Sequence, residues 1–174
     1  MSQLDLFPPS FDSIKSEYSS LFKVSRGTPK PDERDFLMDA TGVDQADYEL
    51  NKQYYCRHLG AMWESLVRHS FENASHLPDP DGGELADIYW QDIGIECKYR
   101  VRSGDGNFWN RLRTKGLKLS SMSIKPILLV CRTDNLHMLY ETSQKGGWIL
   151  KEGQEALGWL REMTGVYLPD TMRT

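Results

Sequence analysis

The sequence lacks any apolar run long enough to cross a bilayer, and it lacks the cysteine spacings that bind metal. No hydrophobic stretch approaches the roughly 18 residues that a spanning helix needs, and MSQLDLFPPS lacks the basic start of a secretory signal. Cys56, Cys97 and Cys131 form no C-x-x-C pair, which argues against a disulfide framework and against a zinc or iron–sulfur site. We therefore expect a cytoplasmic protein without a membrane partner.

The composition is that of an ordinary globular domain. The 174 residues are 39% hydrophobic and 26% charged, which suits one domain with a proper core and is too short for two comfortable ones. We expect an N-terminal accessory helical segment, residues 1–43, and a main domain, residues 44–174. Within the first segment, residues 10–24 place apolar side chains at helical spacing.

The hydrophobic pattern of the main domain alternates between helical and extended periods. The expected elements are, in order, a helix over 44–74, a loop over 77–83, a hairpin over 86–100, a basic helix over 108–122, a buried strand over 125–133, a strand over 136–141 and a helix over 152–165. This order of helices and strands indicates a central sheet covered by helices, an α/β fold.

Positive charge is concentrated in one segment. The whole chain has a net charge of −4, yet residues 98–118 contain seven Lys and Arg residues against the single Asp105. A protein with one anion-facing surface and an otherwise acidic exterior shows this distribution. A solvated basic helix on an acidic protein explains it equally well.

The hairpin ADIYWQDIGIECKYR, residues 86–100, places charged side chains inside a strand. Because successive side chains of a strand point to opposite faces, Ile95 and Cys97 fall on one face, and Glu96 and Lys98 fall on the other. The apolar face is suited to the core, so we expect the charged face to line a cleft or the surface.

Asp87 begins the first strand of the hairpin, and Glu96 lies in the second. Two carboxylates that meet across a hairpin repel each other unless a cation lies between them. Mg²⁺ takes oxygen ligands and keeps several waters for a phosphate substrate, and a lysine beside it can contact the scissile phosphate. The spacing D-x8-E-x-K therefore suits metal-dependent phosphodiester hydrolysis.

With these residues, the sequence resembles the PD-(D/E)XK nuclease superfamily, which has the restriction-endonuclease-like fold. ELADIYWQDIGIECKYR is similar to the same stretch of Holliday-junction resolvases and of small type II restriction enzymes. GAMWESLVRHSF resembles the helix that carries an additional glutamate in members of the superfamily, here Glu64. The resemblance covers roughly residues 50–135 and implies a prokaryotic or phage-encoded protein.

The resemblance implies that Asp87, Glu96, Lys98 and Glu64 are catalytic. Asp87, Glu96, Glu64 and the backbone carbonyl of Cys97 would bind Mg²⁺, with Mn²⁺ as a substitute, and DNA would be the substrate, bound by a homodimer. The expected DNA-binding residues are Arg100, Arg102, Arg111, Arg113, Lys115 and Lys118. Arg100 would share the face of Lys98, and the others would follow the phosphate backbone.

Several alternatives remain at the level of single residues. Asp79 and Asp81 in LPDPDGG each follow a proline, as the literal Pro-Asp motif requires, and either could be its first acid, but we prefer Asp87 because a strand fixes its position. Glu64 equally suits a surface pair with Arg68, four residues later. Phe108 and Trp109 suit either base stacking or, as we favour, the core.

The resemblance favours a Mg²⁺-dependent, restriction-like DNA endonuclease. One alternative is a structure-specific Holliday-junction resolvase. A second is a catalytically inactive DNA-binding or assembly subunit of the same fold, and a third is a hairpin whose Glu96 and Lys98 are merely solvated.

Overall fold

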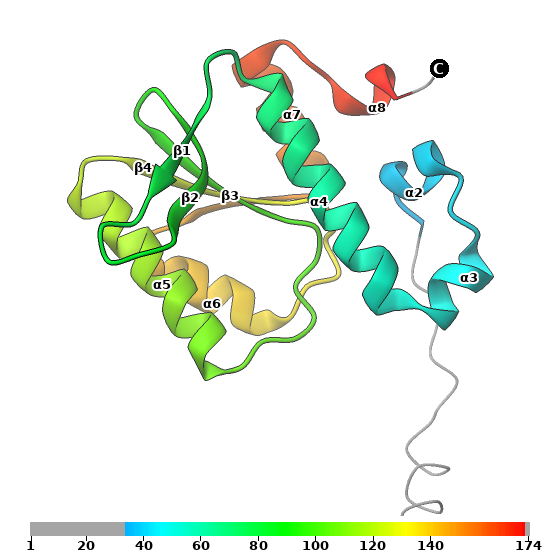
Figure 1. The fold of residues 1–174 in the computed structure, drawn as a ribbon, viewed down its shortest axis with the longest axis horizontal. Coiled ribbons are helices and arrows are strands. Elements are labelled where there is room, and N and C mark those ends of the chain that lie inside the picture. The colour runs from blue at the N-terminus through cyan, green and yellow to red at the C-terminus, as the bar shows by residue number, and fades with distance from the viewer. Residues whose placement is uncertain (1–33, 173–174) are drawn as a thin grey trace, which may run out of the picture. The chain divides into compact units, whose positions relative to one another are not determined.

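The described part of the chain, residues 34–172 of a computed structural model, is built on a five-stranded mixed sheet (Figure 1). In spatial and sequence order the strands are β1 (Ser75–Pro78), β2 (Glu84–Trp90), β3 (Ile93–Lys98), β4 (Lys125–Val130) and β5 (Ile149–Glu152). β1, β2 and β3 pair antiparallel, whereas β3, β4 and β5 pair parallel. Parallel neighbours need long crossover connections, and helices supply both of them.

Helices cover both faces of the sheet, which is the α/β arrangement expected from the sequence. The helices are α2 (Phe36–Thr41), α3 (Gln45–Leu50), α4 (Lys52–Ser70), α5 (Gly106–Ser121), α6 (His137–Gly146), α7 (Gln154–Thr164) and α8 (Leu168–Thr171). Figure 1 shows α4 and α7 on one side of the strands, and α5 and α6 on the other. Each side has its own hydrophobic core.

Alternation along β3 assigns its side chains to these two sides. Ile95, Cys97 and Tyr99 are buried in the core beneath α4 and α7, as the periodicity predicted. Glu96 and Lys98 lie on the opposite face, opposite Leu128 and Val130 of β4, which belong to the α5 and α6 core. The charged face of the hairpin is therefore the face that α5 crosses.

The strand predicted over 136–141 is wrong, because this segment forms the beginning of helix α6. Its buried residues Leu139, Thr142, Ser143 and Gly146 recur at helical spacing, and this pattern becomes visible only when the window extends past residue 141. The strand that pairs with β4 is β5, further along the chain.

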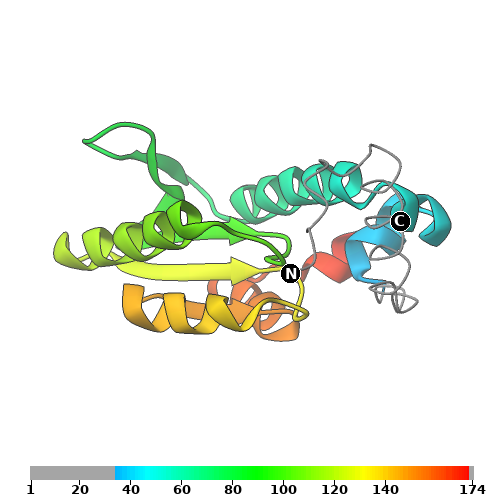
Figure 2. The same cartoon turned by 90° about the horizontal axis from the view of Figure 1, so that it is seen from below.

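Two further boundaries differ from the sequence expectation. The single helix expected over 44–74 is two helices, α3 and α4, separated at Asn51, whose backbone (φ −136°, ψ 51°) is not helical. The loop expected over 77–83 is shorter, because Leu77 and Pro78 belong to β1. Figure 2 shows the β1–β2 hairpin extending away from the rest of the sheet.

The compact unit begins at Arg34, ahead of the boundary predicted between residues 43 and 44. Leu37 and Met38 of α2 are fully buried in the core beneath α4, so α2 is part of the main domain. The helix expected over 10–24 lies outside the described residues. No helix in the described part has the length and apolarity required to span a membrane.

Two glycines bring α5 and α6 into close contact. A Cβ on Gly116 would overlap the main-chain carbonyl oxygen of Gly146 and would lie 2.5 Å from the indole nitrogen of Trp148. That nitrogen donates to the carbonyl of Leu112, 2.8 Å away. Gly116 therefore sets how closely α5 approaches α6.

We expect Gly116→Ala to reduce the free energy of unfolding, because the helices must separate to admit the methyl group, which costs roughly 1–3 kcal/mol. The gain in helix propensity, about 1 kcal/mol, offsets part of this cost, so the net reduction should be up to about 2 kcal/mol. Urea denaturation measures the change. Gly158→Ala in α7 is the matched control, since open space surrounds that position, and this variant should be as stable as the wild type or more so. A Gly116→Ala protein that behaves like the control would contradict this account of the packing.

Candidate active site

The pairing of β2 with β3 places Asp87 opposite Glu96. Ile88 pairs with Ile95 in antiparallel register; Asp87 precedes Ile88 and Glu96 follows Ile95, so the two acids face each other across the pair. The backbone N–H of Cys97 donates to Asp87 Oδ2 at 2.7 Å, so Asp87 is held by the neighbouring strand. Asp87 is 8% exposed and Glu96 is 5% exposed. The eight residues that separate Asp87 from Glu96 are therefore those that form the turn between β2 and β3 and the paired strand ends next to it.

The ammonium group of Lys98 lies among three oxygen atoms. Its Nζ is 2.7 Å from Glu96 Oε1, 3.1 Å from the Cys97 carbonyl oxygen and 3.8 Å from Asp87 Oδ2. Burial lowers the pKa of Lys98, but the charges of Glu96 and Asp87 outweigh burial and raise it. Lys98 is therefore a permanent cation at the point where the oxygens of the predicted metal site converge.

A second lysine reaches the same carboxylate from a different layer. Lys115 of α5 donates to Glu96 Oε2 at 3.0 Å. We expected Lys115 to follow a phosphate backbone, but the structure places its amino group at the acid cluster. Glu96 is therefore bound on one oxygen by a strand lysine and on the other by a helix lysine.

The two acids respond to this environment in opposite directions. Burial raises the pKa of Glu96, but the two lysines outweigh burial and the pKa falls below its ordinary value. Burial and the neighbouring charge of Glu96 raise the pKa of Asp87 to about 6, against the smaller effects of Lys98 and the Cys97 N–H. Glu96 is thus firmly ionised, whereas Asp87 titrates close to neutral pH.

Glu64 is held by another partner. Its Oε1 accepts from Arg68 at 2.9 Å, and the same guanidinium nitrogen donates to the main-chain carbonyl of Asp87 at 2.8 Å. This is the i, i+4 pair that the sequence left open for Glu64. Its charge still contributes to the raised pKa of Asp87, so Glu64 lies near the acid pair while bound to Arg68.

The remaining basic residues divide into separate groups. Arg100 does not share the surroundings of Lys98: its side chain is 5% exposed and lies 2.6 Å from Asp134. Arg102 also approaches Asp134, at 3.6 Å. Lys118 binds Asp79 and Asp81 of the β1–β2 loop, the two acids that were the alternatives to Asp87.

Arg111 and Lys115 face the acid cluster, whereas Arg113 does not. A hollow of about 240 Å³ is lined by Glu96, Lys98, Phe108, Arg111, Leu112 and Lys115. Arg113 is exposed and lines neither this hollow nor the larger one beside it. Phe108 and Trp109 pack against the α5 core, as favoured from the sequence, but Phe108 also lines the smaller hollow.

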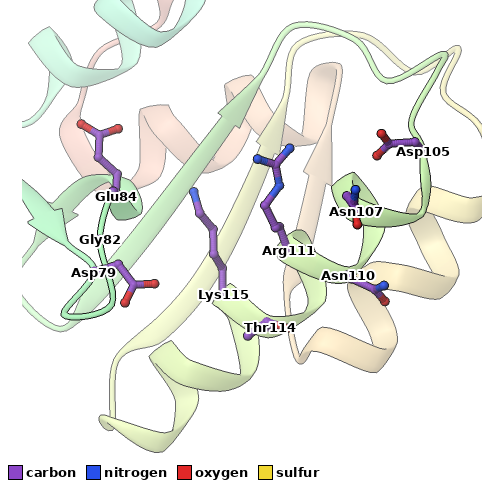
Figure 3. Close-up of a pocket in the computed structure, with 10 residues that line it drawn as sticks. Asp79, Gly82, Glu84, Asp105, Asn107, Asn110, Arg111, Thr114 and Lys115 are labelled. Carbon is purple, nitrogen blue, oxygen red and sulfur yellow. The ribbon is translucent and has the colours of Figure 1, made fainter.

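The larger hollow, about 860 Å³, continues along α5 toward the β1–β2 loop (Figure 3). Figure 3 shows Arg111 and Lys115 extending from α5 in the same direction, with Asp79 and Glu84 across from Lys115. We did not identify Asn107, Asn110 and Thr114, which line it, as site residues. With Arg111 they follow the spacing i, i+3, i+4, i+7, which marks one polar face of a helix.

The oxygen atoms of Asp87, Glu96 and the Cys97 carbonyl fit a hard divalent cation. Mg²⁺ accepts such donors and is usually held by one or two carboxylates while it keeps several waters. A cationic ammonium already lies among the three oxygens. Among residues 34–172, no three or more Asp, Glu, His and Cys side chains form a group suited to metal binding. The oxygens that surround the Lys98 ammonium come from two carboxylates and one main-chain carbonyl.

Comparison with protein-family models, with curated proteins and with solved structures gives no match for this chain.

We expect Asp87→Asn to stabilise the metal-free protein at neutral pH, because it removes a buried charge that faces Glu96. With a pKa of about 6, against about 3.9 in an unfolded chain, Asp87 binds its proton more tightly in the folded state. The loss of folding stability that comes from ionising Asp87 is absent below about pH 4 and is complete above about pH 6. The variant should therefore be more stable than the wild type by on the order of 1–3 kcal/mol above this window, and by little at about pH 4.

Urea unfolding at a series of pH values measures this difference. Asp92→Asn, in the exposed turn of the same hairpin, is the matched control, because it introduces the same amide without removing a buried charge. A difference between Asp87→Asn and wild type that stays constant from about pH 4 to pH 8 would refute the assigned environment of Asp87.

Proposed function

We propose that the protein is a Mg²⁺-dependent DNA endonuclease of the restriction-endonuclease-like fold. The observation that carries the proposal is the convergence of Asp87, Glu96, Lys98 and the Cys97 carbonyl on one face of the β2–β3 hairpin. The position of α5 supports it, since α5 follows the hairpin and delivers Arg111 and Lys115 to the same hollow. Three cations around two buried acids suit a site that receives both a metal ion and a phosphate.

The proposed roles of these residues follow from their charges. Asp87, Glu96 and the Cys97 carbonyl would hold Mg²⁺, which would supply an activated water and neutralise charge on the phosphate. Lys98, as a permanent cation, cannot accept a proton, so its contribution is electrostatic. Its flexible stem allows the ammonium to exchange Glu96 for the scissile phosphate, where negative charge grows in the transition state.

We further propose that the enzyme acts as a homodimer. The described residues of one chain contain one such acid and lysine cluster. Cutting both strands of a duplex in one binding event therefore takes two copies. Sedimentation of the protein on a short duplex gives the number of copies directly.

Metal-dependent cleavage is the primary test. Wild-type protein should cut linear, flapped or four-way-junction DNA in Mg²⁺ or Mn²⁺ and should stop cutting in EDTA. Glu96→Gln should lose cleavage by ~10²-fold or more, because a neutral amide is a poor ligand for a hard cation. DNA binding should persist or strengthen, since one negative charge beside the phosphate is removed. Gel-based cleavage and binding assays on the same substrates give both quantities.

Glu162→Gln is the matched control for this substitution, because Glu162 is exposed on α7, away from the hollows. It should cut like the wild type. Cleavage by Glu96→Gln at the wild-type rate, or undiminished cleavage in EDTA, would refute the proposed site.

Lys98→Gln separates chemistry from binding. The amide of glutamine can still donate to Glu96, but it carries no charge, so we expect a loss of ~10²-fold in the single-turnover rate, as when one preorganised electrostatic donor is removed. DNA affinity should change far less, because Arg111 and Lys115 remain. Lys145→Gln on the exposed surface of α6 is the control and should keep the wild-type rate. Equal rates for the two variants would exclude a catalytic role for Lys98.

A further inference from the structure

The hollow beside the acid cluster has walls of two different kinds. On one side, Asp79 and Glu84 flank the glycine pair Gly82–Gly83 of the β1–β2 loop; on the other, the polar face of α5 presents Asn107, Asn110, Arg111 and Thr114. Gly82 and Gly83 have φ values of +104° and +86°, a backbone conformation that residues other than glycine rarely adopt. Between the carboxylates of Asp79 and Glu84, the loop therefore lines the hollow with main-chain atoms rather than side chains.

These walls do not suit a phosphate group. A phosphate in the hollow would face Asp79, whose pKa is lowered by Lys118, and Glu84 on the same side. Lys118 of α5, which binds Asp79 and Asp81, does not line the hollow. Phosphate-binding cations are confined to the end of the hollow nearest the acid cluster, where Arg111 and Lys115 line both cavities.

The same walls suit the edges of nucleobases. An asparagine amide offers a donor and an acceptor together, which matches the paired groups on the edge of adenine, and a carboxylate accepts from the amino group of cytosine. Asn107, Asn110 and Thr114 are exposed and are not needed by the α5 core. The polar face of α5 is therefore available for a ligand with both donors and acceptors.

We propose that this hollow reads the base sequence next to the scissile phosphate, with Asn107 and Asn110 as specificity-determining residues. Arg111 and Lys115 would hold the backbone at the junction of the two hollows, and the neighbouring bases would lie along α5. This inference rests on the proposed function for the position of the scissile phosphate. It assigns the protein to enzymes that recognise a base sequence rather than to those that recognise only the shape of a junction.

The test is a pool of duplexes with a randomised segment, offered to wild type and to the double variant Asn107→Ala/Asn110→Ala. Fragments bound in the absence of divalent metal and fragments cut in Mg²⁺ are sequenced separately. Wild type should enrich particular bases, and the double variant should lose discrimination on the order of 10-fold at one or two of those positions. Gln144→Ala, an exposed amide on α6 outside both hollows, should retain the wild-type profile.

The outcomes separate this inference from the proposed nuclease activity. Enrichment among bound fragments that the double variant loses supports the inference even if no DNA is cut, and absence of cutting then overturns only the nuclease proposal. Cleavage without base preference overturns the inference and leaves the nuclease. A double variant that binds every sequence more weakly but keeps the wild-type preference also overturns it, because the hollow would then bind the backbone.

Discussion

The burial of the Glu96 carboxylate is the constraint on which the site depends. An ionised acid at 5% exposure must be paired and hydrogen-bonded, because burial of an unpaired charge is expensive. Lys98 supplies one partner from the same strand and Lys115 the other from α5. The pairing thereby ties α5 to the sheet, and the close packing of α5 on α6 supports it from the other side. The two hollows are formed along the helix that this pair positions.

A second polar network, away from Glu96, explains why local charge density alone does not identify a DNA-binding surface. Asp35, the N-cap of α2, accepts from Tyr99 at 2.5 Å and from Arg132 at 2.7 Å. Arg132 in turn donates to Asp134, which also pairs with Arg100. These contacts join α2 to the segments that follow β3 and β4. Part of the positive charge that stands out in the sequence is therefore neutralised within the fold.

Strands β2, β3 and β4 and the two faces of the hairpin were predictable because they depend on local periods. Alternation in β3 separates Cys97 from Glu96 in any sheet that buries one of its faces, and the apolar run of β4 has the pattern of a strand covered on both sides. Helix α6 was mistaken for a strand because LHMLYE is a short, mostly apolar segment that follows a buried strand, yet Leu136, Met138 and Tyr140 are exposed. Its buried residues extend beyond that window.

The sequence by itself determined the α/β class, the β2–β3 hairpin and the convergence of Asp87, Glu96 and Lys98, because residues on one face of a short hairpin meet through local pairing alone. Tertiary structure alone decided which distant cations join them. Lys115 reaches Glu96, Arg100 turns to Asp134, and Lys118 binds the β1–β2 loop, although all three belong to one basic segment. The packing angle of α5 and the path of the loops decide these partners, and neither is encoded in a local period.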